Sequence, residues 1–280
     1  MSLQADREKN WDRISRRLQS SPPDSELRLL VSAAHPDDET IGASMLLSRY
    51  PQSSVAFLTD GAPRDTRLWS AGANGSREEY AETRRQEAFR ALDYAGVSAH
   101  KVFWLGGVDQ EAAFEMVPLA ERLAKLIHQI CPAIVVTHAY EGGHPDHDAA
   151  AMIAKIAISW VDEKIQPALL EMTSYHAIDG RCVTGEFIGS ASSPEIGFEL
   201  SRDDRARKRN MMDAYASQRL VLGNFPIDRE FLRLAPEYDF GQPPHAGKLW
   251  YECMGWPMTG ARWRQLAAAA MLGLQEQSCR

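Results

Sequence analysis

The chain has 280 residues, 44% of them hydrophobic, so it can bury a full core, and we expect one domain over residues 1–280. A net charge of −7 and no basic stripe in the sequence argue against nucleic-acid binding. The four cysteines are scattered, which argues against a zinc knuckle or a disulfide framework. The charged first residues do not resemble a signal peptide, and the longest apolar stretch, residues 149–161, is too short to span a bilayer, so we expect a cytoplasmic protein.

The first predicted element is a polar helix at about residues 5–20. Trp11, Ile14 and Leu18 form a narrow apolar stripe on it, which indicates an accessory helix packed on the domain. Two consecutive prolines, Pro22 and Pro23, end it.

The apolar run that begins at Leu29 predicts a strand buried on both faces of a parallel sheet. It ends in His35-Pro36-Asp37-Asp38-Glu39, and helical spacing resumes over residues 40–50. Open α/β sheets bind their ligands at the carboxyl ends of such strands. No Gly-x-Gly-x-x-Gly follows, so this turn is not built for a dinucleotide.

A second strand is predicted at residues 53–59, followed by a long loop, residues 60–76, that is rich in glycine. A loop of this length in a compact domain is usually functional or mobile, so it is either a substrate lid or a plain surface loop. A helix at 77–96, a strand at 102–105 and an amphipathic helix at 118–130 follow. We expect His128, on the last of these, to be structural.

Residues 131–139 repeat the pattern of the first strand and run into a second polar turn that contains His144-Pro145-Asp146-His147. Counted along the chain, these two strands are the first and the fourth. In a doubly wound sheet of order 3-2-1-4-5 they are neighbours at the switch point, so both turns would meet in one crevice. The sequence therefore predicts a Rossmann-like, mostly parallel α/β sheet with helices on both faces.

The last part of the chain, about residues 168–280, is expected to be a strand-rich elaboration of the same domain. Strands are predicted at residues 169–178, 182–188 and 196–200, then a charged helix that begins at Ser201, and a final alanine-rich helix after Thr259. Residues 225–251 are predicted to be mainly loop. His245 lies there, either on the surface or against the pocket.

The two turns resemble those of the LmbE-like, or PIG-L, family of zinc-dependent N-deacetylases. The family pattern is Ala-His-Pro-Asp-Asp-Glu, here residues 34–39, and His-x-x-His about a hundred residues later, here residues 144–147. The resemblance covers roughly residues 27–220. The further positions that agree are Leu58-Thr59-Asp60-Gly61-Ala62, Arg84-x-x-Glu87, Lys208, Tyr215, Ser217 and Gln218.

The resemblance implies that His35, Asp38 and His147 bind a divalent metal, zinc or iron(II). Two imidazoles and one carboxylate are the ligands of many zinc hydrolases and leave a position open for water. The alternative for His35 is a turn-capping hydrogen bond. For Asp37 and Asp38 it is the favourable charge at a helix amino terminus.

The resemblance also implies four other roles. Asp37 would be the general base, and His144 a cationic donor to the oxyanion. Asp146 would orient His144 and favour its protonated form. Arg84 would point into the substrate pocket. Glu39 and Glu141 are interpreted as first-turn or loop carboxylates.

The function implied is a zinc-dependent hydrolase that removes the N-acetyl group from an N-acetylglucosamine-type conjugate by attack of metal-activated water. A zinc amidase on a non-sugar N-acyl substrate and a non-catalytic, metal-bearing sugar-binding protein remain alternatives. Asp37 and His144 argue against the second, because binding alone needs neither a base nor an acid. The expected partner is a small N-acetylated sugar, with a homo-oligomer left open.

Overall fold

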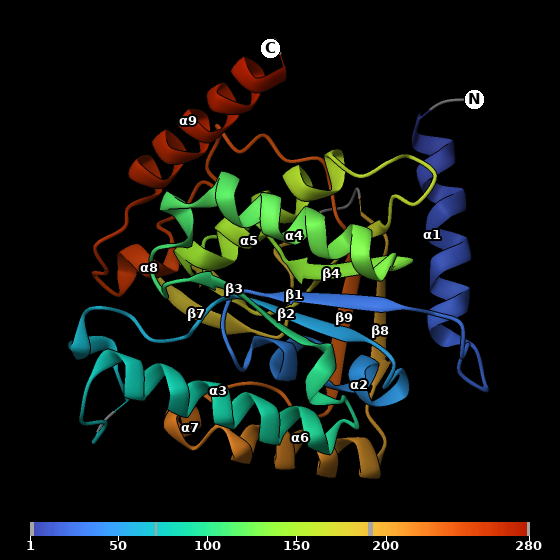
Figure 1. Ribbon diagram of the computed structural model, residues 1–280, viewed down its shortest axis with the longest axis horizontal. Coiled ribbons are helices and arrows are strands. Elements are labelled where there is room, and N and C mark those ends of the chain that lie inside the picture. The colour runs from blue at the N-terminus through green and yellow to red at the C-terminus, as the bar shows by residue number, and fades with distance from the viewer. Residues whose placement is uncertain (1–2, 71, 190–192, 279–280) are drawn as a thin grey trace.

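A twisted seven-stranded sheet of order β3-β2-β1-β4-β5-β9-β8 forms the centre of the computed structural model, which describes residues 3–70, 72–189 and 193–278 (Figure 1). The first five strands in this order are parallel: β3 (Val102–Gly107), β2 (Ser54–Thr59), β1 (Leu29–Ala33), β4 (Ile134–His138) and β5 (Ala168–Met172). The predicted order 3-2-1-4-5 is confirmed. Two antiparallel strands, β9 (Arg229–Leu234) and β8 (Glu195–Glu199), extend it beyond β5.

The two central strands are buried along their whole length, as their apolar sequences predict. Every residue of β1 and of β4 is buried. Val31 is paired with Val136, and the strands run in the same direction, so both end at one edge of the sheet. The polar turns that follow them therefore emerge side by side.

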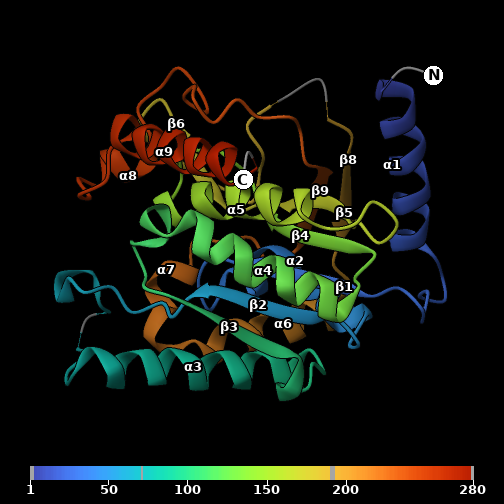
Figure 2. The same cartoon turned by 45° about the horizontal axis from the view of Figure 1, so that its top comes forward.

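Helices cover both faces of the sheet (Figures 1 and 2). One face carries α2 (Asp38–Arg49), α3 (Arg77–Tyr94) and α6 (Arg202–Ala214), and the other carries α4 (Met116–Ile130), α5 (Pro145–Ser159) and α9 (Gly260–Ser278). The accessory helix α1 (Leu3–Gln19) adds Trp11, Ile14 and Leu18 to the first core. The doubly wound α/β class is thus confirmed. Among the described helices, none has the length and apolar character that crossing a bilayer requires.

In the last part of the chain, one predicted strand was wrong and one strand was missed. The strand predicted at 169–178 divides into β5 and β6 (Tyr175–Ile178), which forms a separate hairpin with β7 (Arg181–Thr184). The region 225–251 is mainly loop, as predicted, but it contains β9, and two short helices lie at its ends, α7 (Arg219–Leu222) and α8 (Trp250–Cys253). Strand β9 was missed because its charged side chains are buried in ion pairs: Glu230 bonds Lys208, and Arg233 bonds Glu171.

Helix α2 is kinked close to the first polar turn. Ala43 has non-helical dihedral angles (φ −141°, ψ 16°). The buried Lys208–Glu230 ion pair bonds the backbone groups on either side of this kink. Lys208 Nζ donates to the Ile41 carbonyl (2.7 Å), and Glu230 accepts the Met45 N–H (3.1 Å). This pair stabilises the helix that carries Asp38.

Candidate metal centre

The turn after β1 has a constrained backbone. Asp37 has φ 120°, a value that side-chain-bearing residues rarely adopt. Its N–H donates to Glu39 Oε2 (3.0 Å), and the other Glu39 oxygen accepts the Tyr215 hydroxyl (2.8 Å). Glu39, interpreted above as a first-turn carboxylate, is fully buried and holds the turn.

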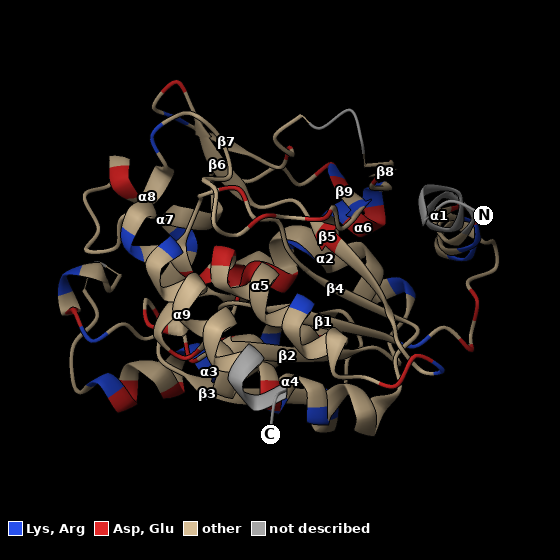
Figure 3. Cartoon of the chain, turned by 90° about the horizontal axis from the view of Figure 1, so that it is seen from above, with Lys and Arg blue, Asp and Glu red and all other residues tan. Residues whose placement is uncertain are grey.

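The turn after β4 leads directly into α5. His144 is the N-cap, Pro145 occupies the first helical turn, and His144 Nδ1 accepts the Asp146 N–H (3.0 Å). Figure 3 shows the acidic start of α5, formed by Asp146 and Asp148. The helical geometry places His147 one turn in, facing β1.

The structure brings the three predicted metal ligands together. Asp38 Oδ2 lies 3.2 Å from His35 Nδ1, and Asp38 Oδ1 lies 3.2 Å from His147 Nε2. Burial lowers the pKa of His147 to about 3. Burial would raise the pKa of Asp38, but His147 and His138 hold it well below its ordinary value. A neutral imidazole beside an ionised carboxylate is the protonation state that binds a divalent cation.

The other edge of the His35 ring faces two carboxylates. His35 Nε2 lies 3.1 Å from Asp109 Oδ1 and 3.1 Å from Asp146 Oδ2. Burial alone would lower the pKa of His35, but Asp109 and the other carboxylates raise it well above its ordinary value. Metal-binding histidines commonly donate their second ring N–H to such a carboxylate.

This arrangement corrects the expectation for Asp146. Its carboxylate faces His35 and accepts the N–H groups of Gln110 (2.7 Å) and Ala112 (3.1 Å). Only its backbone N–H reaches His144. The start of α5 explains the difference. His144 is the N-cap, and its side chain accepts the backbone N–H of Asp146, so the Asp146 side chain points away from His144.

His144 also differs from the expected cationic donor. Burial, followed by the nearby His35, lowers the pKa of His144 well below its ordinary value. Since Nδ1 accepts an N–H, the neutral ring carries its proton on Nε2. The Gln110 amide nitrogen lies 2.6 Å from Nε2, and since two N–H groups cannot bond each other, the amide must present its oxygen to this N–H. His144 can therefore donate a hydrogen bond without being charged.

Arg84 lies in the pocket wall but is already bonded. It is 2% exposed, donates to Asp37 Oδ2 (2.8 Å) and to the Pro36 carbonyl, and contacts Glu87 (3.2 Å) and Ser217 Oγ (3.2 Å). Arg84, expected to point into the substrate pocket, lines the cavity, but its guanidinium is bonded to Asp37. Burial raises the pKa of Asp37 to about 7, while Arg84 acts to lower it.

Three polar residues at the site were missed by sequence reasoning. His138 ends β4, stacks on His147 with ring centroids 3.9 Å apart, and has Nε2 3.3 Å from Asp38 Oδ2. Its place at the carboxyl end of a buried strand was the available signal. Asp109 and Gln110 follow β3 at the same sheet edge, but no motif marks them there.

A cavity of about 170 Å³ opens over this cluster. Asp37, His144 and Tyr175 line it, together with Gly61 and Pro63 of the 60–76 loop. The loop therefore forms a wall of the cavity. His245 is half-buried and is not among the lining residues, which favours the surface alternative.

The family model described as "PIG-L: GlcNAc-PI de-N-acetylase" matches residues 30–158. A 1D-myo-inositol 2-acetamido-2-deoxy-alpha-D-glucopyranoside deacetylase of Kineococcus radiotolerans is 29% identical over 44% of this chain and 42% of its own length. One of Nakamurella multipartita is 26% identical over 81% of this chain and 94% of its own length. A mycothiol S-conjugate amidase of Streptomyces coelicolor is 28% identical over 47% of this chain and 52% of its own length. The chain spans about half the length of most of these relatives.

Solved structures share the fold at low identity. A deacetylase of teicoplanin biosynthesis has a TM-score of 0.54 at 17% identity, covering 76% of this chain and 100% of that one. The 4-carboxy-2-hydroxymuconate hydratase of Pseudomonas putida has a TM-score of 0.52 at 18% identity, covering 76% and 98%. Since a hydratase and deacetylases share this fold, the fold alone does not specify the reaction.

Proposed function

We propose that this chain, whose residues 30–158 match the PIG-L family model, hydrolyses the N-acetyl amide of an N-acetylglucosamine-type conjugate. The observation that carries the proposal is the meeting of three ligand-type side chains, His35, Asp38 and His147, between a buried carboxylate and a buried imidazole. The strands β8 and β9 continue the same sheet, which supports treating residues 1–280 as one domain.

The donor set fits a divalent metal. Asp38 is ionised, His147 is neutral, and further carboxylates surround His35, so the site carries buried negative charge that a cation would offset. We assign His35, Asp38 and His147 as the ligands of zinc or iron(II). A divalent metal bound there would polarise the amide carbonyl and make water more acidic.

The remaining residues divide the proton transfers between them. Asp37, with a pKa raised to about 7, accepts a proton from the attacking water and passes it to the departing amine. Arg84 holds the Asp37 carboxylate in place. On the other side of the ligands, His144 donates from Nε2 to the developing oxyanion. Asp146 and Asp109 hold the His35 ring.

The substrate class follows from the names of the relatives, several of which are deacetylases of an inositol-linked N-acetylglucosamine. A second candidate is hydrolysis of a larger amide on such a sugar, because one relative is a mycothiol S-conjugate amidase. Non-sugar N-acyl substrates remain the alternative in the same reaction class.

The test is metal analysis of the purified chain beside acetate release from a panel of N-acetylglucosaminides and N-acetyl amino acids. We expect about one divalent ion per chain and release from the sugars. Release only from the amino acids would reject the sugar substrate, and metal binding without any release would reject the enzyme.

A further inference from the structure

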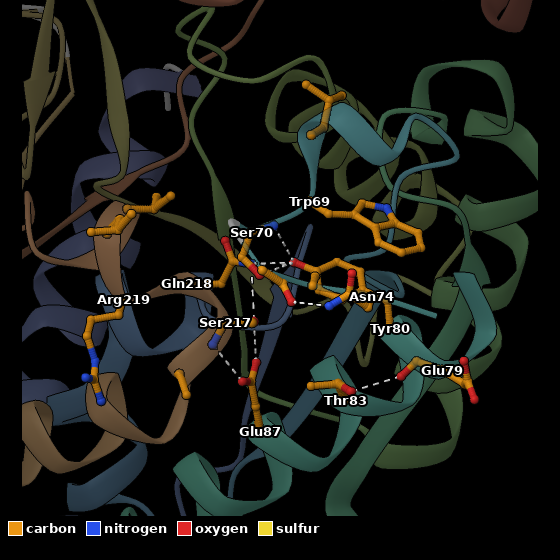
Figure 4. A pocket seen from close by; sticks show the side chains of 16 residues that line it. Trp69, Ser70, Asn74, Glu79, Tyr80, Thr83, Glu87, Ser217, Gln218 and Arg219 are labelled. Atoms are coloured by element: carbon orange, nitrogen blue, oxygen red, sulfur yellow. Dashed lines mark hydrogen bonds between the residues drawn. The ribbon is translucent and has the colours of Figure 1, made fainter. Parts of the chain in front are cut away.

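A second and larger cavity adjoins the metal cavity. Its volume is about 830 Å³. One wall is formed by the 60–76 loop and the start of α3, and the opposite wall by residues 216–221 (Figure 4). Four residues line both cavities, so the two spaces lie next to each other: Leu68, Tyr80, Gln218 and Val221. We call the larger cavity the vestibule.

The loop wall of the vestibule is an ordered aromatic surface. Trp69 stacks on Tyr80 with ring centroids 4.7 Å apart and planes 14° apart. Trp69 Nε1 donates to the Pro63 carbonyl (2.8 Å), and the Ser70 N–H donates to the Tyr80 hydroxyl (3.3 Å). The first bond lies within the loop, whereas the second bond and the ring stacking hold the loop against α3, as Figure 4 shows for Ser70 and Tyr80.

The opposite wall exposes two aliphatic side chains to solvent. Leu220 is 81% exposed and Val221 51% exposed, although both are large hydrophobic residues. An apolar ligand group seated in the cavity would cover these side chains and remove their surface from water.

Two of the three charged residues that line the vestibule, Glu79 and Glu87, are bonded within the protein. Glu87 is buried and accepts the Ser217 N–H (2.8 Å) and hydroxyl (2.6 Å). Glu79 accepts the Ser76 N–H at the start of α3 (2.7 Å). Arg219 lies apart from the Trp69–Tyr80 pair in Figure 4. Around the Trp69–Tyr80 pair, the vestibule therefore presents apolar and neutral polar groups, including the Gln218 amide, and the exposed Arg219 lies at its far side.

The vestibule lies on the side of the metal cavity where the amine would depart. Asp37, the proposed proton donor to the amine, bonds Arg84, and Arg84 Nη1 bonds Ser217 Oγ in the vestibule wall. His144, the proposed donor to the oxyanion, packs instead against Trp256, with ring centroids 4.8 Å apart. The acyl half of the amide would thus face Trp256, and the amine half the vestibule.

We propose that the vestibule is the subsite for the aglycone of the sugar, and that it selects an uncharged apolar group, an aryl or alkyl glycoside. This inference rests on the proposed function, because it takes its direction from the roles of Asp37 and His144. A metal cavity of about 170 Å³ is filled by little more than one sugar ring, so any aglycone must extend beyond it.

The kinetic test compares the phenyl, hexyl, methyl and myo-inositol glycosides of N-acetylglucosamine. We expect kcat/KM for the phenyl and hexyl glycosides to exceed that of the methyl glycoside by roughly tenfold or more, as burial of their apolar surface implies. Equal values, or a myo-inositol glycoside that outperforms the phenyl glycoside, would overturn the apolar assignment.

Two matched variants test the location. Leu220→Asp should bring the phenyl-to-methyl ratio of kcat/KM close to one. Leu272→Asp, at a 62% exposed position on α9, across the sheet from α7, should leave the ratio unchanged. An unchanged ratio in Leu220→Asp would overturn the subsite. A second result would also overturn it. If Leu220→Asp kept the aglycone preference but no longer distinguished N-acetyl from N-hexanoyl substrates, the vestibule would hold the acyl chain instead.

A binding measurement separates this inference from the proposed function. Phenyl glucoside has no amide, so calorimetric titration reports the subsite without turnover. We expect a Kd at least tenfold higher in Leu220→Asp than in the wild type and in Leu272→Asp. That result without acetate release from any substrate would leave the apolar subsite standing and reject the deacetylase. Equal Kd values in all three proteins, with normal acetate release, would reject the subsite and keep the deacetylase.

Discussion

The carboxylate of Asp146 pairs with His35: Asp146 Oδ2 lies 3.1 Å from His35 Nε2, whereas His144 receives only the Asp146 backbone N–H. An aspartate two residues from one histidine thus supports another that is 111 positions away in the chain. This pairing makes Asp146 a support for His35, one of the proposed metal ligands.

Replacing Asp146 by Asn should therefore weaken metal binding by about 10- to 100-fold, the usual effect of losing the carboxylate behind a metal-binding histidine. Competition with a chelator measures the affinity. Activity at saturating metal should recover most of its value. Unchanged affinity combined with an altered pH profile would return Asp146 to the role of orienting His144.

The adjacent aspartates should respond in opposite ways. Asp38→Asn should lose metal and activity together, because the ligand is removed. Asp37→Asn should keep the metal and lose about 10²- to 10⁴-fold in kcat, since an amide cannot take the proton. Metal content beside kcat for both proteins is the measurement. Metal loss in Asp37→Asn with retention in Asp38→Asn would mean that the roles are exchanged.

Arg84 is expected to act through Asp37. Arg84→Lys should lower kcat by roughly 10²-fold, since a small displacement of a catalytic group has an effect of this size. KM for a neutral glycoside and metal content should change little. Arg90→Lys, an exposed substitution on the same helix, is the control. A large rise in KM at constant kcat would instead place Arg84 in contact with the substrate.

The Lys208–Glu230 pair should contribute to stability only as a pair. Lys208→Met leaves Glu230 as a buried, uncompensated charge and should cost about 3–5 kcal/mol in free energy of unfolding. The double variant Lys208→Met/Glu230→Gln should cost less than the sum of the two single variants. Urea denaturation of the three proteins and the wild type provides these values. Additive costs would show that the two side chains act independently.

Glu171 should make stability depend on pH. Burial raises the pKa of Glu171 from 4.5 to about 7, although Arg233 opposes the shift. The folded state thus binds the proton more tightly than the unfolded state. The contribution is fully present below pH 4.5 and is lost as the pH rises through 7. Relative to Glu171→Gln, the wild type should lose about 3 kcal/mol in free energy of unfolding between pH 4.5 and 8. A constant difference, measured by urea denaturation, would contradict this.

Buried strands were the part of the fold most readily predicted. The strands β1 and β4 carry uninterrupted apolar runs, and a proline follows each within the next polar turn, so their ends and their shared edge could be read directly. Strand β9 could not be predicted in this way. Its Glu230 and Arg233 have the composition of a surface segment, and only their distant partners, Lys208 and Glu171, make their burial favourable.

The sequence by itself determined the order of the central strands and the meeting of His35, Asp38 and His147, because parallel strands end at one edge whatever their loops contain. Tertiary structure alone decided which polar groups pair around them. The Asp109–His35 and Arg84–Asp37 contacts join loops and helices that lie far apart in the sequence, and no repeating pattern of residues links them. Hydrogen bonding depends on distance and direction within a few tenths of an ångström, and no spacing in a sequence encodes those.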